Sequence, residues 1–560
     1  MQKTCTNCSA SFEITQEDLD FYDEISPTYQ DKKYTVPPPT LCPTCRYQRR
    51  LMFRNEDSIY KRKSDLSGKE IVSIYAPDAP YKVYDQDEWW SDDWDPLEYG
   101  RDFDFSKSFT EQFIALTRDT PHASLYTTNV ENSYYTNYAL NLRNCYLVFG
   151  VTNGEDNLYG HYVINCKDTV DSLSTFSCES CYEGIASKGC YQCQYFRNCR
   201  NCSDCFMIDN CVNCKNCIES FGLRGREYCY KNKYVGEDEI KRIRKDISPL
   251  THKKIADMRN NLDELRMKLP HPNSYIIASE NCTGDTIFNS KNCQHCFDID
   301  ECEDCKYLSY SPRSNNSQDT TFNAPDGLQW SYEMCCAVGN HTCLANFLSW
   351  YNSNTYYSFE CHNSHYLFGC SSLNKKEYCI FNKQYTQIDY EILVPKIIEH
   401  MQKTGEWGEY LSTDLSPFAY NETKAHDEFP LSKEEVIAKG WTWREETDEM
   451  PDVEKIIPAN KLPDSIDDIP DDILNWAVKC EITGRPFKIV QQELKFYRKM
   501  GLPIPHAHPD ERYRRRMMKR NPRKLWERTC DKCSKEMQTT YAPERPETVY
   551  CEHCYLQTIY

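Results

Sequence analysis

The chain lacks any long apolar segment, and this absence excludes proteins that cross a membrane. Its 560 residues contain no apolar run near the roughly 20 residues that a membrane-spanning helix requires. The opening segment, MQKTCTNCSASFEIT, also lacks the apolar core of a secretory signal. We therefore expect a cytoplasmic protein without a membrane partner.

Excess positive charge and familiar catalytic motifs are missing as well. The net charge of −19 argues against a protein that coats nucleic acid with its whole surface, although a local basic face stays open. No nucleophile elbow, phosphate-binding loop or HExxH helix is present, and the 13 histidines are scattered. The sequence therefore predicts that the protein is not an enzyme.

Glycine is scarce, with 19 residues, whereas cysteine is abundant, with 33. A hydrophobic share of 39% supports packed cores, and the length suffices for roughly three or four domains. An odd number of cysteines cannot all pair within one chain. In a reducing compartment they are expected to be metal ligands or buried thiols instead.

Four CxxC pairs lie near the two ends of the chain, and they predict two structural zinc ions. Zinc favours four thiolates in a tetrahedron, which two short CxxC turns can supply. Unmetallated or redox-active thiols are the alternative. The predicted ligands are Cys5, Cys8, Cys42 and Cys45 in the N-terminal set, and Cys530, Cys533, Cys551 and Cys554 in the C-terminal set.

The two ends also resemble each other, which predicts a duplicated module of two ribbons. The run RYQRRLMFRN from Arg46 matches RYRRRMMKRN from Arg512. Each copy has other residues at one set of ligand positions. These are Ser64, Ser67, Asp85 and Glu88 in the N-terminal copy, and Cys480, Thr483, His508 and Glu511 in the C-terminal copy. Cys480 and His508 are candidates for a weak metal site, and a metal-free ribbon held by apolar residues is the alternative.

Both copies carry a basic segment that is a candidate for contact with nucleic acid. The alternatives are a solvated helix face, arginines that pair with acidic segments of the same chain, and contact with a protein partner. The candidates for phosphate contact are Arg49, Arg50, Arg515 and Arg516.

The central part of the chain predicts a parallel β-solenoid rich in cysteine. A fixed short period indicates a stacked repeat, and twelve residues suit a narrow parallel coil whose Asn-rich corners tolerate left-handed backbone. Reduced cysteine can fill its thin interior. The alternative is a metal-storage, iron–sulfur or redox role, because residues 199–205 read C-x2-C-x2-C. One column with this period is Cys166, Cys178, Cys190, Cys202 and Cys214.

These patterns predict a mainly β fold with added helices, in six segments. A helix is expected after each solenoid unit, because an open coil end exposes unpaired strands. The segments are a two-ribbon module at 1–110, a first solenoid unit at 125–235, a helical cap at 236–270, a second solenoid unit at 271–385, a helix with an acidic linker at 386–475, and a two-ribbon module at 476–560.

The opening CxxC, the segments LCPTCRYQRRLMFRN and EWWSDDWDPLEYGRDFDF, the Asn-Cys repeats and the terminal TTYAPERPETVYCEHCY resemble a group of uncharacterised zinc-ribbon proteins from candidate-phyla bacteria. The resemblance covers most of the chain. It implies zinc binding, a bacterial cytoplasm and a loss of ligands at Ser64, Ser67, Asp85 and Glu88, and it implies no activity. Together the patterns favour a non-enzymatic zinc-binding scaffold or interaction protein.

Overall fold

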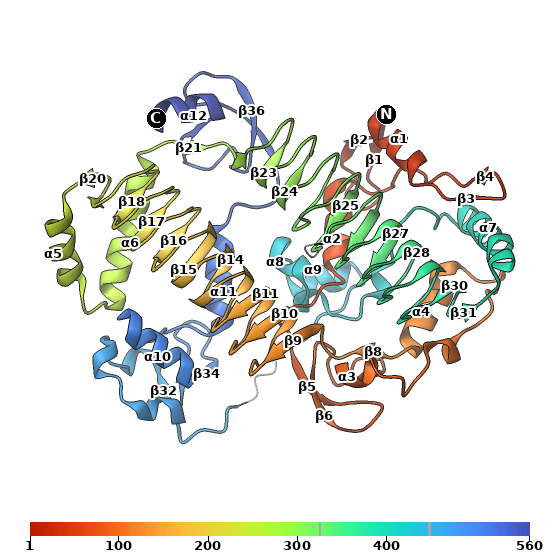
Figure 1. Cartoon of the computed structure of the whole chain (residues 1–560), viewed down its shortest axis with the longest axis horizontal. Helices are drawn as coiled ribbons and strands as arrows, with labels where there is room; N and C mark the ends of the chain where they lie inside the picture. The colour runs from red at the N-terminus through yellow and green to blue at the C-terminus, as the bar shows by residue number, and fades with distance from the viewer. Residues whose placement is uncertain (324–325, 446–449, 560) are drawn as a thin grey trace.

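Two stacks of short parallel strands form the centre of the fold (Figure 1). The computed structural model describes residues 1–323, 326–445 and 450–559. Residues 324–325 of the second predicted solenoid unit, 446–449 of the predicted linker and Tyr560 of the last module lie outside the described residues. Most neighbouring strands of a stack follow one another in the chain, with no helix between them.

The first stack is a sheet whose parallel strands pair with a register of twelve residues. Ala139 lies beside Val151, for example, and Phe206 lies beside Ile218. The final pair, β19 and β20, is an antiparallel hairpin. The strands are β9 (Thr127–Glu131), β10 (Asn137–Arg143), β11 (Phe149–Glu155), β12 (His161–Ile164), β13 (Lys167–Val170), β14 (Leu173–Phe176), β15 (Glu179–Lys188), β16 (Gln194–Arg197), β17 (Phe206–Asp209), β18 (Ile218–Phe221), β19 (Cys229–Tyr230) and β20 (Lys233–Tyr234).

The second stack repeats this arrangement. Tyr332 lies beside Leu344, twelve residues on, although Ile276 lies beside Ile287, eleven residues on, and Gln318 lies beside Tyr332, fourteen residues on. Its strands are β22 (Ile276–Ile277), β23 (Gly284–Phe288), β24 (Cys296–Asp300), β25 (Gln318–Thr321), β26 (Tyr332–Cys335), β27 (His341–Phe347), β28 (Ser353–Tyr356), β29 (His365–Phe368), β30 (Glu377–Ile380) and β31 (Lys383–Gln384).

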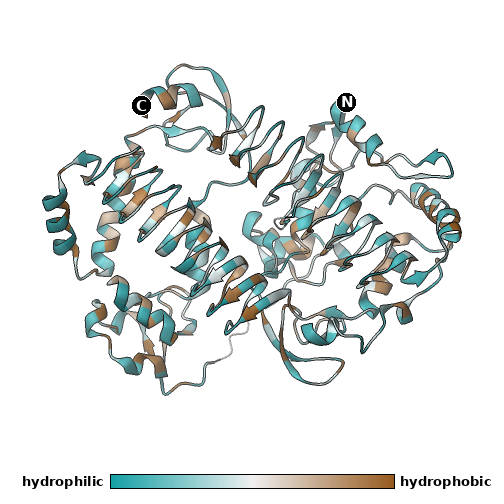
Figure 2. Cartoon of the chain, in the orientation of Figure 1, coloured by the Kyte–Doolittle hydropathy of each residue, from teal (hydrophilic) through white to brown (hydrophobic). Residues whose placement is uncertain are grey.

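Each twelve-residue turn has a corner at every third residue. Asn201 and Asp204, for example, have φ angles of 50° and 54°, in the left-handed region that asparagine and aspartate enter more readily than most residues. The residue after a corner is usually buried, as Cys202 and Cys205 are. This explains the recurrent Asn-Cys pairs, and it adds a period of three to the predicted period of twelve. Figure 2 accordingly shows apolar and polar residues interspersed along the strands.

The interior of a stack is narrow, so the sizes of neighbouring side chains must match. Gly184 lies beside Phe196 in adjacent strands, β15 and β16. A Cβ atom at position 184 would come within 2.6 Å of Cζ of Phe196. The ring of Phe196 therefore occupies the space that a side chain at 184 would need.

Four small ribbons surround the stacks, each built on an antiparallel hairpin, and we name them by chain end and order. Ribbon N1 (1–52) contains β1 (Gln2–Thr4), β2 (Ser11–Glu13), α1 (Gln16–Glu24), β3 (Thr28–Tyr29), β4 (Lys32–Lys33) and α2 (Pro43–Leu51). Ribbon N2 (60–89) contains β5 (Tyr60–Lys63), β6 (Glu70–Ser73), β7 (Val83–Tyr84) and α3 (Gln86–Trp89). Ribbon C1 (476–519) contains β33 (Trp476–Lys479), β34 (Pro486–Lys488), α10 (Gln491–Met500) and α11 (Pro509–Lys519). Ribbon C2 (526–559) contains β35 (Trp526–Thr529), β36 (Glu536–Thr539), β37 (Val549–Tyr550) and α12 (Glu552–Ile559).

The ribbons of each chain end are divided between the two stacks. In the N-terminal module, α2 packs on β25 and β26 of the second stack, whereas β7 pairs with β8 (His122–Ala123) at the start of the first. In the C-terminal module, α11 packs on β14 of the first stack, whereas β37 pairs with β21 (His271–Pro272) at the start of the second. The molecule therefore has two pseudo-equivalent halves. We call the first stack with N2 and C1 the first half, and the second stack with N1 and C2 the second half.

Helices follow both stacks, as α5 (Glu237–Ile247) and α6 (His252–Met267) after the first and α7 (Gln387–Thr404) after the second. The remaining regular elements are α4 (Phe109–Asp119), α8 (Lys424–Glu428), α9 (Lys433–Ala438) and β32 (Lys455–Pro458). Part of the predicted acidic linker contributes to the core, because Tyr420 and Val436 are buried in the largest apolar cluster. None of the helices in the described ranges combines the length and the apolar character that a bilayer crossing requires.

Candidate metal centres

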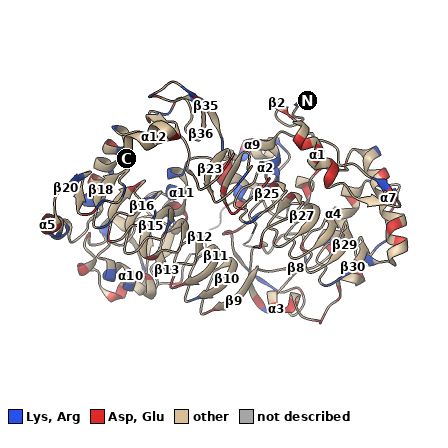
Figure 3. Ribbon diagram, turned by 45° about the horizontal axis from the view of Figure 1, so that its top comes forward, with Lys and Arg blue, Asp and Glu red and all other residues tan. Residues whose placement is uncertain are grey.

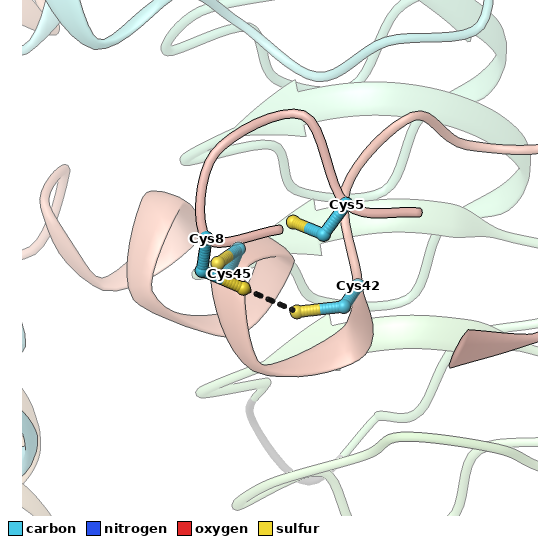
Figure 4. A group of neighbouring side chains, drawn as sticks. All are labelled: Cys5, Cys8, Cys42 and Cys45. Atoms are coloured by element: carbon cyan, nitrogen blue, oxygen red, sulfur yellow. Dashed lines mark hydrogen bonds between the residues drawn. The ribbon is translucent and has the colours of Figure 1, made fainter. Parts of the chain in front are cut away.

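The predicted N-terminal ligands come together in ribbon N1. Cys5 and Cys8 lie in the turn between β1 and β2, and Cys42 and Cys45 lie at the start of α2, so that the four side chains point toward one another (Figure 4). The turn is closed by hydrogen bonds from the amide of Cys5 to the carbonyl of Ala10 (2.9 Å) and from the amide of Ser9 back to Cys5 (3.0 Å). This closure holds the first two sulfur atoms on the same side of the hairpin.

The spacing of these sulfur atoms suits a tetrahedral ion. All four Sγ atoms lie within 4.8 Å of one another, and those of Cys8 and Cys42 are 3.7 Å apart. A tetrahedron with zinc–sulfur bonds of about 2.3 Å has edges of about 3.8 Å. The Nδ2 group of Asn7 donates a hydrogen bond to Sγ of Cys45 (3.3 Å) and so stabilises a thiolate there. Asn7 is not among the residues that the sequence predicts at the site, although its position between Cys5 and Cys8 indicates that its side chain can reach the sulfur atoms.

The predicted C-terminal ligands come together in the same way in ribbon C2. The amide of Cys530 donates to the carbonyl of Lys535, and the amide of Ser534 donates back to Cys530, both at 2.8 Å. The four Sγ atoms again lie within 4.8 Å of one another, with 3.8 Å between those of Cys533 and Cys551. The amide of Cys551 donates to Sγ of Cys530 (3.3 Å). Both sets can therefore hold a metal ion.

The pKa values in the two sets indicate shared negative charge. A hydrogen bond from the thiol of Cys45 lowers the pKa of Cys42 to about 5, and the pKa of Cys45 rises in turn. Burial opposes ionisation of Cys530, but backbone amides of Cys551 and Cys533 outweigh it, so this pKa falls to about 6. Burial and the neighbouring thiols raise the pKa of Cys554 to about 12. Sulfur atoms this close cannot all ionise alone, and a bound cation would remove that restriction.

Ribbon N2 has the same turn but no thiols at the ligand positions. The amide of Ser64 donates to the carbonyl of Lys69 (2.8 Å) and the amide of Gly68 donates back to Ser64 (2.9 Å), as in the intact ribbons. The hydroxyl of Ser64 donates to the carboxylate of Glu88, and Nζ of Lys69 lies 3.5 Å from Asp85. In ribbon N2, the hydroxyl of Ser64 and the carboxylates of Asp85 and Glu88, with the ammonium group of Lys69 nearby, therefore lie where the intact ribbons have their four sulfur atoms.

Ribbon C1 also keeps the turn, with the amide of Gly484 donating to the carbonyl of Cys480 (3.0 Å). Nδ1 of His508 accepts a hydrogen bond from the amide of Asp510 (3.2 Å) at the start of α11. Glu511 pairs with Arg514 (2.9 Å). The weak metal site at Cys480 and His508 stays a prediction. Both intact sets belong to the second half of the molecule, and both altered ribbons belong to the first.

Comparisons with protein-family models, with curated proteins and with solved structures found no match.

Three of the four arginines predicted to contact nucleic acid pair with carboxylates of the same chain at 2.9 Å or less. Arg50 is buried and pairs with Asp319 (3.1 Å) and Glu333 (2.7 Å) of the second stack. Arg49 pairs with Glu333 as well (2.9 Å). Basic and acidic residues accordingly lie side by side around α2 in Figure 3. Arg49 and Arg50 thus form ion pairs with carboxylates of the same chain, which is one of the alternatives to nucleic-acid contact that the sequence leaves open.

The C-terminal copy behaves in the same way. Arg516 is buried and its Nη1 lies 2.7 Å from Oδ1 of Asp171 in the first stack, and Arg512 contacts the other oxygen of that carboxylate (2.5 Å). Arg515 alone of the four candidates keeps a largely exposed side chain (46%), 3.6 Å from Glu481. The basic segments therefore attach the ribbons to the stacks.

The cysteines of the stacks lie in columns inside the coil. Sγ of Cys202 donates to the carbonyl of Cys211 (3.4 Å), which illustrates how these thiols satisfy the backbone. Burial raises the pKa of Cys302 to about 12 and that of Cys343 to about 11, so these thiols stay protonated. Hydrogen bonds from neighbouring thiols act in the opposite direction at Cys293, where Cys296 lowers the pKa to about 4. Across residues 1–323, 326–445 and 450–559, only the two ribbon sets gather three or more Cys, His, Asp or Glu ligands within 4.8 Å. This arrangement favours the interior-filling role over the metal and redox alternative.

Proposed function

We propose that the protein is a non-enzymatic scaffold in which two structural zinc ions hold ribbons N1 and C2 against a pair of β-solenoid units. The observation that carries the proposal is the convergence of eight thiols into two four-sulfur sets with tetrahedral spacing. Four-thiolate sets in a reduced protein suit zinc better than calcium or magnesium, which prefer oxygen ligands.

The arrangement of the ribbons explains why such ions would be useful. Ribbon N1 is small, and its only regular elements are short strands and helices of at most nine residues. Ions that cross-link its two CxxC turns would fix α2, whose arginines reach the carboxylates of the second stack. The scaffold role thus rests on a chain of contacts from metal ligands to stack. We also propose, from the sequence resemblance, that the chain is one of the zinc-ribbon proteins of candidate-phyla bacteria.

Metal analysis of the protein purified without oxygen or chelator tests the proposal. We expect two zinc ions per chain, one fewer in Cys8→Ser and one fewer in Cys533→Ser, because each loses an exposed ligand. Cys305→Ser is the matched control. It changes a buried stack cysteine whose column continues with Ser317, and it should keep both ions. Retention of zinc in both ribbon variants, or its loss in the control, would contradict the proposal.

The same measurement addresses the alternative role in metal storage, iron–sulfur or redox chemistry. Stoichiometric iron with visible absorption, or zinc well above two ions per chain, would place ligands in the stacks and replace the scaffold by that alternative.

A further inference from the structure

A polar cavity lies where the first stack, the start of the second stack and the segment between ribbons C1 and C2 meet. Its volume is about 40 Å³, and its lining includes Arg197 and Asp209 of the first stack, Asp285 of the second and Lys519 of α11. The side chain of Lys519 is 40% exposed, so the cavity is open to solvent on that side. None of these residues belongs to the metal centres.

The pseudo-equivalent place in the molecule is filled by aromatic rings. Phe53, just after α2, corresponds to Lys519 at the end of α11. In the second stack, Phe347 and Phe359 correspond to Arg197 and Asp209 of the first stack. Both stack pairs occupy neighbouring strands in register. The rings of Phe53 and Phe347 are 5.6 Å apart, and those of Phe347 and Phe359 are 4.9 Å apart. All three phenylalanines are fully buried.

The comparison shows that the fold does not require charge at these three positions, although the buried pair of Arg54 and Glu56 directly follows Phe53 in the chain. Three buried phenylalanines complete one half, whereas the other half has two cations and a carboxylate at the same positions. Apolar packing is usually at least as stabilising as a buried ion cluster of similar volume. A charged cavity that replaces an apolar core is therefore better explained by a ligand than by stability.

The charges of the lining favour an anion. Asp209 is shared by two cations, Arg197 and Arg266, the latter at 2.7 Å. Asp298 is likewise approached by Arg523 (2.7 Å) and Arg520 (4.0 Å). Lysine and arginine thus outnumber carboxylates among the residues that line the cavity. From outside the lining, Glu183 pairs with Lys519, and Glu428 pairs with Arg520 and Arg523.

We propose that this cavity binds one small tetrahedral oxyanion of the size and charge of phosphate or sulfate. A cavity of about 40 Å³ has room for about three water molecules, which is enough for a single ion of this kind but not for a nucleoside. Guanidinium and ammonium groups are the donors that bind such ions most strongly. The site is independent of the zinc sets and of the scaffold role.

Calorimetric titration of the full-length, zinc-loaded protein with sodium phosphate, and separately with sodium sulfate, tests the site. We expect saturable binding of one ion per chain. Lys519→Gln should weaken it about tenfold, because a charged donor is lost. Arg515→Gln is the matched control on the same helix, since Arg515 does not line the cavity, and it should leave affinity within about twofold.

A second variant moves affinity in the opposite direction. Asp285→Asn removes a negative charge from the lining and should tighten phosphate binding several-fold, a change that damage to the fold would not produce. Saturable binding of either anion with these opposite shifts supports the proposal. Absence of binding at tens of millimolar phosphate and sulfate overturns it, as does equal affinity in the wild type, Lys519→Gln and Asp285→Asn.

Discussion

Asp285 and Asn137 occupy pseudo-equivalent positions, and this pair allows the effect of one buried carboxylate on stability to be predicted. The amide of Tyr275 donates to Oδ1 of Asp285 (2.7 Å), and the amide of Tyr126 donates to Oδ1 of Asn137 (3.0 Å). Both side chains thus accept a hydrogen bond from the amide of the equivalent tyrosine, Asp285 as a carboxylate and Asn137 as a neutral amide. Replacing Asp285 by asparagine should therefore preserve the fold of the second stack.

The magnitude follows from the pKa of Asp285. Burial raises this pKa from 3.8 to about 6, although hydrogen bonds from Tyr275 and Thr540 act in the opposite direction. A shift of about 2 units corresponds to about 3 kcal/mol. Because the folded pKa lies above the unfolded one, the carboxylate lowers stability as pH rises above 3.8, and the loss is complete above about pH 6.

Asp285→Asn should accordingly increase the free energy of unfolding by about 3 kcal/mol at pH 7.5 and by about half of that at pH 5. Urea unfolding followed by circular dichroism, in buffer free of phosphate and sulfate, measures both differences. The reciprocal variant Asn137→Asp is the control and should lose stability at pH 7.5. Equal gains at the two pH values, or a loss at pH 7.5, would refute the reasoning that burial of charge is the cause.

Three further predictions concern the attachment of the ribbons, the stack interior and the metal. Asp171→Ala removes the carboxylate that two buried arginines share and should lower the free energy of unfolding by about 3–5 kcal/mol; Asp319→Ala should cost less in the other half, because Glu333 still pairs with Arg50, and denaturant titration measures both. Gly184→Ala places a Cβ 2.6 Å from the ring of Phe196 and should cost about 1–3 kcal/mol in the same assay, so an unchanged midpoint would show that the stack can expand. A chelator should remove the metal from both ribbons, because Cys8 is exposed, and should lower the melting temperature while the far-ultraviolet signal of the stacks persists; loss of that signal on chelation at room temperature would mean that the stacks depend on metal.

The metal ligands were predictable because their chemistry is local. A CxxC turn is closed by hydrogen bonds between residues five positions apart or fewer, as between Cys5 and Ala10, so its geometry can be inferred from spacing. The pairing of the first turn with Cys42 and Cys45 also followed, since zinc needs four ligands. The grouping of the eight cysteines in two sets is confirmed, whereas the identity of the metal is still a prediction.

The periodic part of the fold was predictable for a similar reason. Because each strand pairs with the strand twelve residues on, its register appears in the sequence as a repeat of twelve residues. The cysteine columns have this period, and the observed pairing of Phe206 with Ile218 has the same register. The corner at every third residue was missed, because residues such as Met207, with a φ of 53°, carry no turn signal of their own. The backbone there is imposed by the neighbouring turns.

Tertiary structure alone decided what the charged residues do. In the sequence, Arg50 and Arg516 are part of exposed-looking basic runs, but Glu333 and Asp171, hundreds of residues away, bury and neutralise them. No local pattern records such a partner, because an ion pair depends on distance in space and on exclusion of water. The sequence by itself thus determined which atoms can hold a metal and how the strands repeat. The division of each chain end between two stacks, and with it the polar cavity of one half and the aromatic core of the other, was decided only when distant segments packed together.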